Sequence, residues 1–112
     1  MPYVRVETNV QPADVPQAVR RLSAAVAEAL GKQERWVMAH LVPGAHLAYG
    51  GTDAPAAYVQ LESIGLAVEQ CAALSEAICA HLGGSLGVPP ERIYIDFKDV
   101  ERARFGWNGL TF

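Results

Sequence analysis

Two copies of a strand-helix-strand pattern fill most of this sequence of 112 residues. The first copy begins with alternating apolar and polar residues in Tyr3–Thr8, which predict a strand. Apolar residues then recur three or four positions apart in 15–30, which predicts a helix with Asp14 as its N-cap and Gly31 at its end. The apolar run Trp36–Val42 predicts the second strand and completes this copy.

The second copy has the same elements in the same order. An alternating pattern in Tyr58–Ser63 predicts a strand, and apolar residues at helical spacing follow in 71–82. We expect this helix to fray at the glycines of Gly83–Gly87, because an interior glycine costs about 1 kcal/mol relative to alanine. The run Ile93–Phe97 predicts the fourth strand. The dipeptide Glu-Arg precedes the last strand of both copies, 57 residues apart. The repetition therefore extends to the segments that connect each helix to its following strand.

The two units predict one domain of the α/β (α+β) class over residues 1–112, with pseudo-repeats at about 1–50 and 57–100. Right-handed crossovers place both helices on one face of a four-stranded sheet. The segment 105–112 follows the second unit. Its Asn108-Gly109 pair stands between aromatic and aliphatic residues and predicts a small C-terminal hairpin.

The opposite face of this sheet has no helix to cover it. The strands at 36–42 and 93–97 are apolar at nearly every position, which is typical of a sheet that is buried on both faces. Apolar residues make up 51% of the chain, and a small domain buries a limited share of its surface. We therefore expect other subunits to cover the free face, with the C-terminal hairpin packed near the interface.

The charge balance narrows the classes of partner. Nine Lys and Arg against twelve Asp and Glu give a net charge of −3, and no basic run exceeds Arg20-Arg21. We expect neither a nucleic-acid partner nor a membrane partner.

With no signal peptide, the expected location is cytoplasmic, with non-classical secretion as a further route. No metal is expected, because the three histidines lack ligand spacing with the cysteines.

Pro2 is a candidate general base. Removal of Met1 would leave Pro2 with a free secondary amine, and a chain-terminal amine has an ordinary pKa of about 7.7 to 8.0. Burial, or a nearby cation such as Lys32, would lower this pKa further and give a neutral base near physiological pH. The alternative is an ordinary Met-Pro start without a catalytic role, and Pro2 alone does not decide between the two.

Seven segments spread over the whole chain carry a family resemblance. They are the run 1–10, Gly31-Lys32, His40–Pro43, Tyr49–Gly51, Ser63–Gly65, 90–95 and Gly106–Asn108. Together they resemble the macrophage migration inhibitory factor family, a relative of D-dopachrome tautomerase in the tautomerase superfamily. The resemblance implies two β-α-β repeats per subunit and a homotrimer whose sheets enclose a central channel.

The resemblance also implies an active site between subunits. Ser63–Gly65 lies where a strand turns into a helix, so the amides and the helix dipole there favour an anion independently of the family. Asp96 stands where the family commonly has Asn, and its carboxylate would repel an anionic substrate. The implied roles are Pro2 as catalytic base, Lys32 and the Ile64 amide as holders of the substrate carboxylate or carbonyl, and Tyr94 from the neighbouring subunit. Trp36, Phe105 and Trp107 would line an aromatic wall, and Phe112 would close its far end.

The implied activity is enol–keto isomerisation of phenylpyruvate-like α-keto acids, or of dopachrome-like substrates, without a cofactor. Two alternatives stay open. One is a cytokine-like binding protein with a vestigial pocket. The other is a proline-dependent hydratase or dehalogenase, which needs an additional arginine and acid, for which Arg5, Arg104 and Glu62 are candidates. The segment Ala56–Val59 lacks the family's redox Cys-x-x-Cys, so thiol oxidoreductase activity is not implied.

Overall fold

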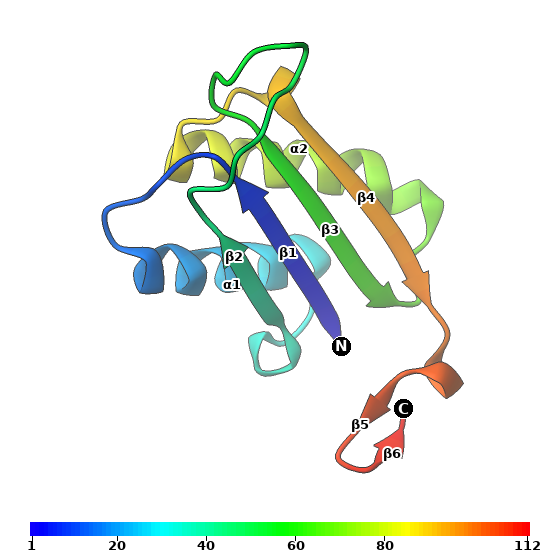
Figure 1. Cartoon of the computed structure of the whole chain (residues 1–112). Helices are drawn as coiled ribbons and strands as arrows, with labels where there is room; N and C mark the ends of the chain where they lie inside the picture. The colour runs from blue at the N-terminus through cyan, green and yellow to red at the C-terminus, as the bar shows by residue number, and fades with distance from the viewer.

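The two strand-helix-strand units form one mixed sheet in the computed structural model, which describes residues 1–112 (Figure 1). The strand order is β2-β1-β3-β4, with parallel outer pairs and an antiparallel central pair, β1 and β3. A separate two-stranded hairpin, β5 and β6, lies beyond the end of this sheet. The elements are β1 (Pro2–Thr8), α1 (Val15–Leu30), β2 (Met38–Val42), β3 (Ala57–Ile64), α2 (Val68–Leu86), β4 (Ile93–Val100), β5 (Gly106–Trp107) and β6 (Leu110–Thr111), with short 3₁₀ helices η1 (Glu34–Trp36), η2 (Pro90–Arg92) and η3 (Arg102–Arg104).

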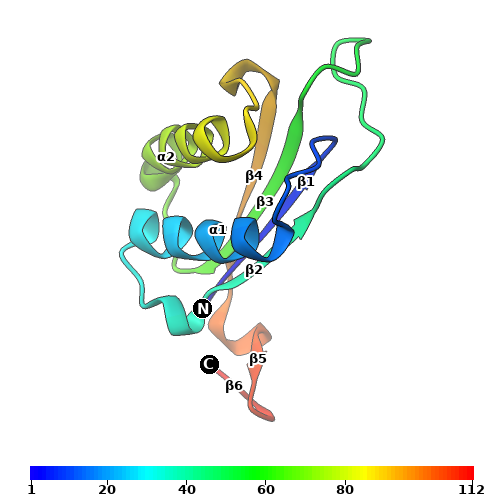
Figure 2. The same ribbon diagram turned by 90° about the vertical axis from the view of Figure 1, so that its left-hand side faces the viewer.

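Both helices cover the same face of the sheet, as expected (Figure 2). The alternation along β1 buries Val4 and Val6 completely on this face, and β3 does the same with Val59 and Leu61. Burying a side chain of this size stabilises the folded state by about 1.5 to 3 kcal/mol relative to leaving it exposed to water. The core between sheet and helices is therefore built from the apolar positions that define the repeated sequence pattern, together with Leu22, Val26, Leu74, Ile78 and Leu82 of the helices.

The ends of α1 agree with the sequence. The Asp14 side chain accepts a hydrogen bond of 3.0 Å from the Gln17 amide, which satisfies one of the free amides of the first turn. At the other end, Gly31 adopts the left-handed conformation with φ of 65°. Its amide donates to the Glu28 carbonyl, so the helix stops there.

The predicted fraying of the second helix is wrong. Helix α2 continues through Gly83 and Gly84 to Leu86, and Gly87 ends it with φ of 69°. Leu82 and Leu86 lie one turn apart and are both buried. Their packing holds this last turn in helical conformation despite the weak intrinsic helix preference of the two glycines.

This arrangement predicts opposite effects of alanine at two neighbouring glycines. Gly84 is exposed inside the helix and an added Cβ meets no atom within 4 Å, so Gly84→Ala is expected to stabilise the protein by about 1 kcal/mol. Gly87→Ala is expected to destabilise it by about 1 kcal/mol, because its positive φ disfavours a side chain. Urea unfolding at one fixed protein concentration measures both, and shifts of the same sign would contradict this account.

The segments that lead into β2 and β4 differ slightly from the prediction. The predicted strand from Trp36 begins only at Met38, because residues 34–36 form the 3₁₀ turn η1. The repeated Glu-Arg pairs thus lie in two matching 3₁₀ turns. Arg35 stacks over the Trp36 ring at 4.9 Å, whereas Arg92 stacks over the Tyr49 ring at 5.0 Å. The guanidinium of Arg92 also donates to the carbonyl groups of residues 49, 52, 54 and 55.

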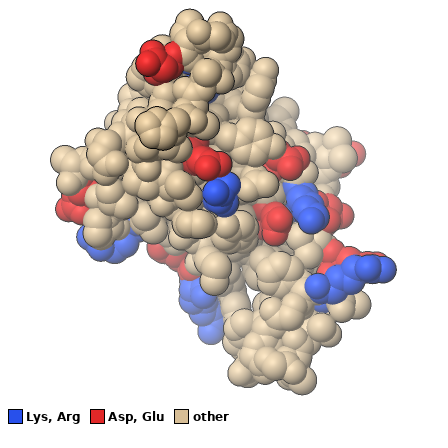
Figure 3. Space-filling view, in the orientation of Figure 1, with Lys and Arg blue, Asp and Glu red and all other residues tan.

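The helix-free face of the sheet is more polar than predicted. On β4, Ile95 and Phe97 pack against the core, while Tyr94, Asp96 and Lys98 are exposed on the other side. The run at 93–97 therefore alternates like a half-buried strand, and its apolar residues do not cover both faces. Figure 3 shows acidic and basic side chains interspersed on the side of the molecule seen in Figure 1, without an extended basic patch.

The C-terminal hairpin turns at Asn108 and Gly109, which have φ of 52° and 74°. Positive φ at both central residues is the geometry that brings two short strands together through a two-residue turn.

Neither α1 nor α2 combines the length and the apolar character needed to cross a membrane.

Candidate active site

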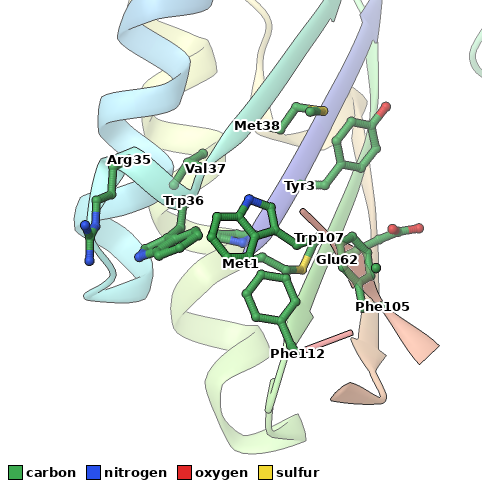
Figure 4. Close-up of a pocket in the computed structure, with 12 residues that line it drawn as sticks. Met1, Tyr3, Arg35, Trp36, Val37, Met38, Glu62, Phe105, Trp107 and Phe112 are labelled. Carbon is green, nitrogen blue, oxygen red and sulfur yellow. The ribbon is translucent and has the colours of Figure 1, made fainter. Parts of the chain in front are cut away.

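A cavity of about 360 Å³ lies at the amino-terminal end of β1 (Figure 4). The start of β1, the segment from η1 to β2, the end of β3 and the C-terminal tail all contribute to its wall. Eight of its twelve lining residues are hydrophobic. The lining residues are Met1, Pro2, Tyr3, Arg35, Trp36, Val37, Met38, Glu62, Phe105, Gly106, Trp107 and Phe112.

Four predicted aromatic residues form one side of this cavity. The ring of Trp36 meets Trp107 edge to face at 5.0 Å and Phe112 at 6.0 Å, and Trp107 stacks on Phe112 at 5.8 Å. Phe105 joins the group through Phe112, whose amide donates to the Phe105 carbonyl. The tight hairpin turn makes this possible, because it folds Phe112 back beside Phe105. Ring contacts at these distances are favourable beyond their buried area.

Pro2 is fully buried and lies opposite Ser63 in the antiparallel pairing of β1 and β3. The Lys32 ammonium donates hydrogen bonds of 3.0 Å to the Ser63 hydroxyl and to the Ile64 carbonyl. Ser63, which is 1% exposed, donates in turn to the Met1 carbonyl over 3.5 Å. Lys32 and Ile64 do not line the cavity themselves, but Ser63 connects them to the amino terminus.

The electrostatic surroundings favour an uncharged amino terminus. Burial lowers the pKa of the chain's amino group below its ordinary value, and the positive charges of Lys32 and Arg102 lower it further. In this structure that amino group belongs to Met1. Pro2 follows Met1 directly, so its nitrogen lies next to the group on which these two cations act.

The turn between β3 and α2 already holds an anionic group of the chain itself. The Asp99 carboxylate accepts hydrogen bonds of 3.0 and 3.1 Å from the amides of Gly65 and Leu66. The strand-to-helix turn predicts an anion here, and the amides of Gly65 and Leu66 bind the Asp99 carboxylate of β4. The atom of Ile64 that contacts Lys32 is the carbonyl oxygen.

Tyr94 and Asp96 lie outside this cavity. They pair with Tyr58 and Gln60 of β3, and the Tyr94 ring contacts the Tyr49 ring at 5.0 Å. Tyr94 remains 60% exposed. Any contribution of these residues to a site must therefore come through a second copy of the chain, as the resemblance implies for Tyr94.

Several lining residues were not singled out from the sequence as pocket residues, notably Tyr3, Arg35 and Met38, and Glu62 was named only as an acid for the hydratase or dehalogenase alternative. Glu62 is the partner of Tyr3 in the register of β1 and β3, so correct strand pairing would have placed it there. The buried Ser63 next to it was seen only as part of a turn. No group of three or more His, Cys, Asp or Glu side chains is arranged to hold a metal ion.

Comparisons with known proteins agree on one family. The family model described as macrophage migration inhibitory factor (MIF) matches residues 1–112. Macrophage migration inhibitory factor of Mus musculus is 37% identical over 114 residues, covering 100% of this chain and 99% of that protein. A homolog from Trichuris trichiura is also 37% identical, with 100% of both chains covered.

Solved structures give the same result. A macrophage migration inhibitory factor homologue from Prochlorococcus marinus superimposes with a TM-score of 0.90 at 38% identity, covering 98% of each chain. The macrophage migration inhibitory factor from Trichinella spiralis has a TM-score of 0.91 at 34% identity, with 98% of this chain and 99% of that chain covered. The likeness therefore extends over nearly the whole chain.

Proposed function

This chain belongs to the macrophage migration inhibitory factor family, and from that premise we propose that it is a cofactor-independent tautomerase acting on phenylpyruvate-like α-keto acids. One observation carries the proposal. The amino terminus lies in an aromatic-lined cavity, where burial and two cations lower the pKa of its amine. Removal of Met1 makes Pro2 the carrier of that amine, and a neutral secondary amine is a competent base near neutral pH.

The proposed reaction is a proton transfer between oxygen and carbon. Neutral Pro2 takes the proton from the enol oxygen of the substrate and returns it to the adjacent carbon, or the reverse, so the base is regenerated in each turnover. The phenyl ring of the substrate would pack on the wall formed by Trp36, Trp107 and Phe112. This contact fixes the reacting carbon relative to Pro2, and positioning of this kind supplies much of the rate enhancement in such reactions.

Lys32 does not line the cavity within one chain, and we propose that it binds the substrate carboxylate where the site is completed between subunits. An ammonium group has three hydrogen-bond donors, and two of them are directed to Ser63 and Ile64. The third is available to a carboxylate, and a charge-assisted bond of this kind is stronger than a neutral one. The Ile64 amide is the second proposed contact of this carboxylate.

Enol–keto kinetics on a sample whose amino terminus has been characterised by mass spectrometry test the proposal. Protein that starts at Pro2 is expected to accelerate the interconversion of phenylpyruvate enol and keto forms, followed by ultraviolet absorbance. Protein that retains Met1 has an amide at Pro2 and is expected to be inactive. Equal activity of the two forms, or no activity of the processed form, would refute it.

We also propose a homotrimer with its active sites between subunits. The outer edges of β2 and β4 have no strand partner within the chain, and Met38 and Leu110 are 67% and 70% exposed. A neighbouring copy would cover these residues and bring Tyr94 to the site. Light scattering at micromolar concentration is expected to give three times the chain mass of 12.0 kDa, and a stable monomer would contradict the trimer.

A second candidate function is favoured by Glu62 and Arg35, which both line the cavity. Hydration of an α,β-unsaturated acid by a proline-dependent enzyme needs an acid to activate water and an arginine to bind the substrate. Arg5 and Arg104, the arginines named from the sequence for this role, are paired with Glu7 and Glu101 instead, and Arg35 was not predicted from the sequence. Incubation with an unsaturated acid, with its hydration product followed by NMR, separates this activity from tautomerisation.

A further inference from the structure

Ser63 lies between Lys32 and the amino terminus, and its hydrogen bonds have a defined direction. Lys32 can only donate, so the Ser63 oxygen accepts from it, over 3.0 Å. The hydroxyl hydrogen of Ser63 is directed to the Met1 carbonyl, over 3.5 Å. Because the side chain is buried at 1% exposure, these protein groups fix its orientation. Ser63 is therefore a hydrogen-bond donor toward the amino terminus.

The acceptor of this bond is directly attached to the Pro2 amide. A carbonyl oxygen lies about 2.3 Å from the nitrogen of the following residue in standard peptide geometry. Removal of Met1 removes this oxygen and leaves the Pro2 amine beside the Ser63 hydroxyl, its register partner. We propose that Ser63 is a positioning residue that donates its hydroxyl hydrogen to the neutral Pro2 amine and so favours the free base. The inference rests on the proposed role of Pro2.

The chemistry of the two protonation states gives the direction of this effect. Neutral Pro2 has a lone pair that can accept the Ser63 hydrogen. Protonated Pro2 has none, and its own N–H groups would compete with Lys32 for the Ser63 oxygen. Two cations would then share one hydroxyl oxygen, which is unfavourable in a buried site. The Lys32–Ser63 pair thus distinguishes the two forms through hydrogen bonding as well as through charge.

Other charged groups around the amino terminus act at the same time. Lys32 and Arg102 lower the pKa of the amine, and Arg35, which lines the cavity, has the same sign of charge. Glu62 lines the cavity with the opposite charge, and a carboxylate close to an amine favours its protonated form. Asp99 lies opposite Ser63 on β4, with its carboxylate bound by two backbone amides. A test must therefore remove the hydroxyl and keep all these charges.

Ser63→Ala meets this requirement. The pKa of Pro2 is measured by NMR titration of protein labelled with ¹⁵N-proline, after mass spectrometry has verified that Met1 is absent. We expect Ser63→Ala to raise this pKa by about half a unit to one unit, and to move the ascending limb of the pH–rate profile by the same amount. Ser63→Thr retains the hydroxyl and is expected to restore the lower pKa. Ser85→Ala, at an exposed position of α2, is the matched control and is expected to change nothing.

An unchanged pKa of Pro2 in Ser63→Ala would overturn the inference, because the hydroxyl would then have no effect on the amine. A lowered pKa would also overturn it, because Ser63 would then accept a hydrogen bond from the protonated amine. If Ser63→Ala does not fold, Ser63→Cys serves the same test, since a thiol is a weaker donor and should give a smaller rise. The titration requires no turnover. A wild-type protein without enol–keto exchange but with the expected pKa shift would therefore refute the proposed function and leave this inference intact.

Discussion

Pro2→Gly is expected to lower kcat for enol–keto exchange by at least about 100-fold. A positioned general base contributes about 10² to 10⁴ to the rate, and glycine loses that positioning. It retains an amino group, but without the pyrrolidine ring the backbone at the terminus rotates freely and the amine no longer has one direction. An amino-terminal extension that converts the Pro2 nitrogen into an amide is expected to abolish activity completely.

The measurement is steady-state kinetics with phenylpyruvate, on variants whose first residue has been verified by mass spectrometry. Pro12→Gly is a suitable control, because it makes the same chemical exchange in the loop between β1 and α1. Turnover that survives both Pro2→Gly and the extension would remove Pro2 from the mechanism.

Lys32→Met is expected to raise KM for phenylpyruvate by about 10- to 100-fold, with a smaller effect on kcat. A hydrogen bond to a charged group is worth about 1.5 to 3 kcal/mol, and methionine removes it while keeping a side chain of similar length. The ascending limb of the pH–rate profile should also move to higher pH. The reason is that loss of the Lys32 charge removes one of the causes that lower the amine pKa.

Both changes can be read from one set of pH-dependent kinetics. Arg20→Met removes a positive charge from an exposed position of α1 and is expected to leave KM and the profile unchanged. A change in KM without a shift of the pH–rate profile would mean that Lys32 binds the substrate but does not lower the pKa of Pro2. No change in either quantity would exclude Lys32 from the site.

The sequence predicted those elements that are determined by local pattern. The alternation in β1, the apolar spacing of α1, and the caps at Asp14 and Gly31 all depend on neighbouring residues, and the structure confirms them. The end of α2 was missed, because burial of Leu86 outweighs the local cost of glycine. The polarity of the free sheet face was missed because the run 93–97 is mostly apolar. Its exposed members, Tyr94 and Asp96, alternate with Ile95 and Phe97, which pack against the core.

The cavity depends on contacts between distant parts of the chain. Trp36 and Phe112 meet only because the tail folds back beneath β1, and no local pattern specifies that. The family resemblance supplied these residues. It did not supply Ser63 as a link between Lys32 and the amino terminus, since that link requires the pairing register of β1 with β3.

The two Glu-Arg turns place their arginines in different surroundings. Arg92 is committed to holding a loop through four carbonyl groups, whereas its counterpart Arg35 stacks on one ring at the cavity wall. Loss of the Arg92 side chain would release the loop at residues 49–55, whereas Arg35 holds no loop. The cavity wall can therefore change in charge and shape at Arg35 without loss of the contacts that hold this loop.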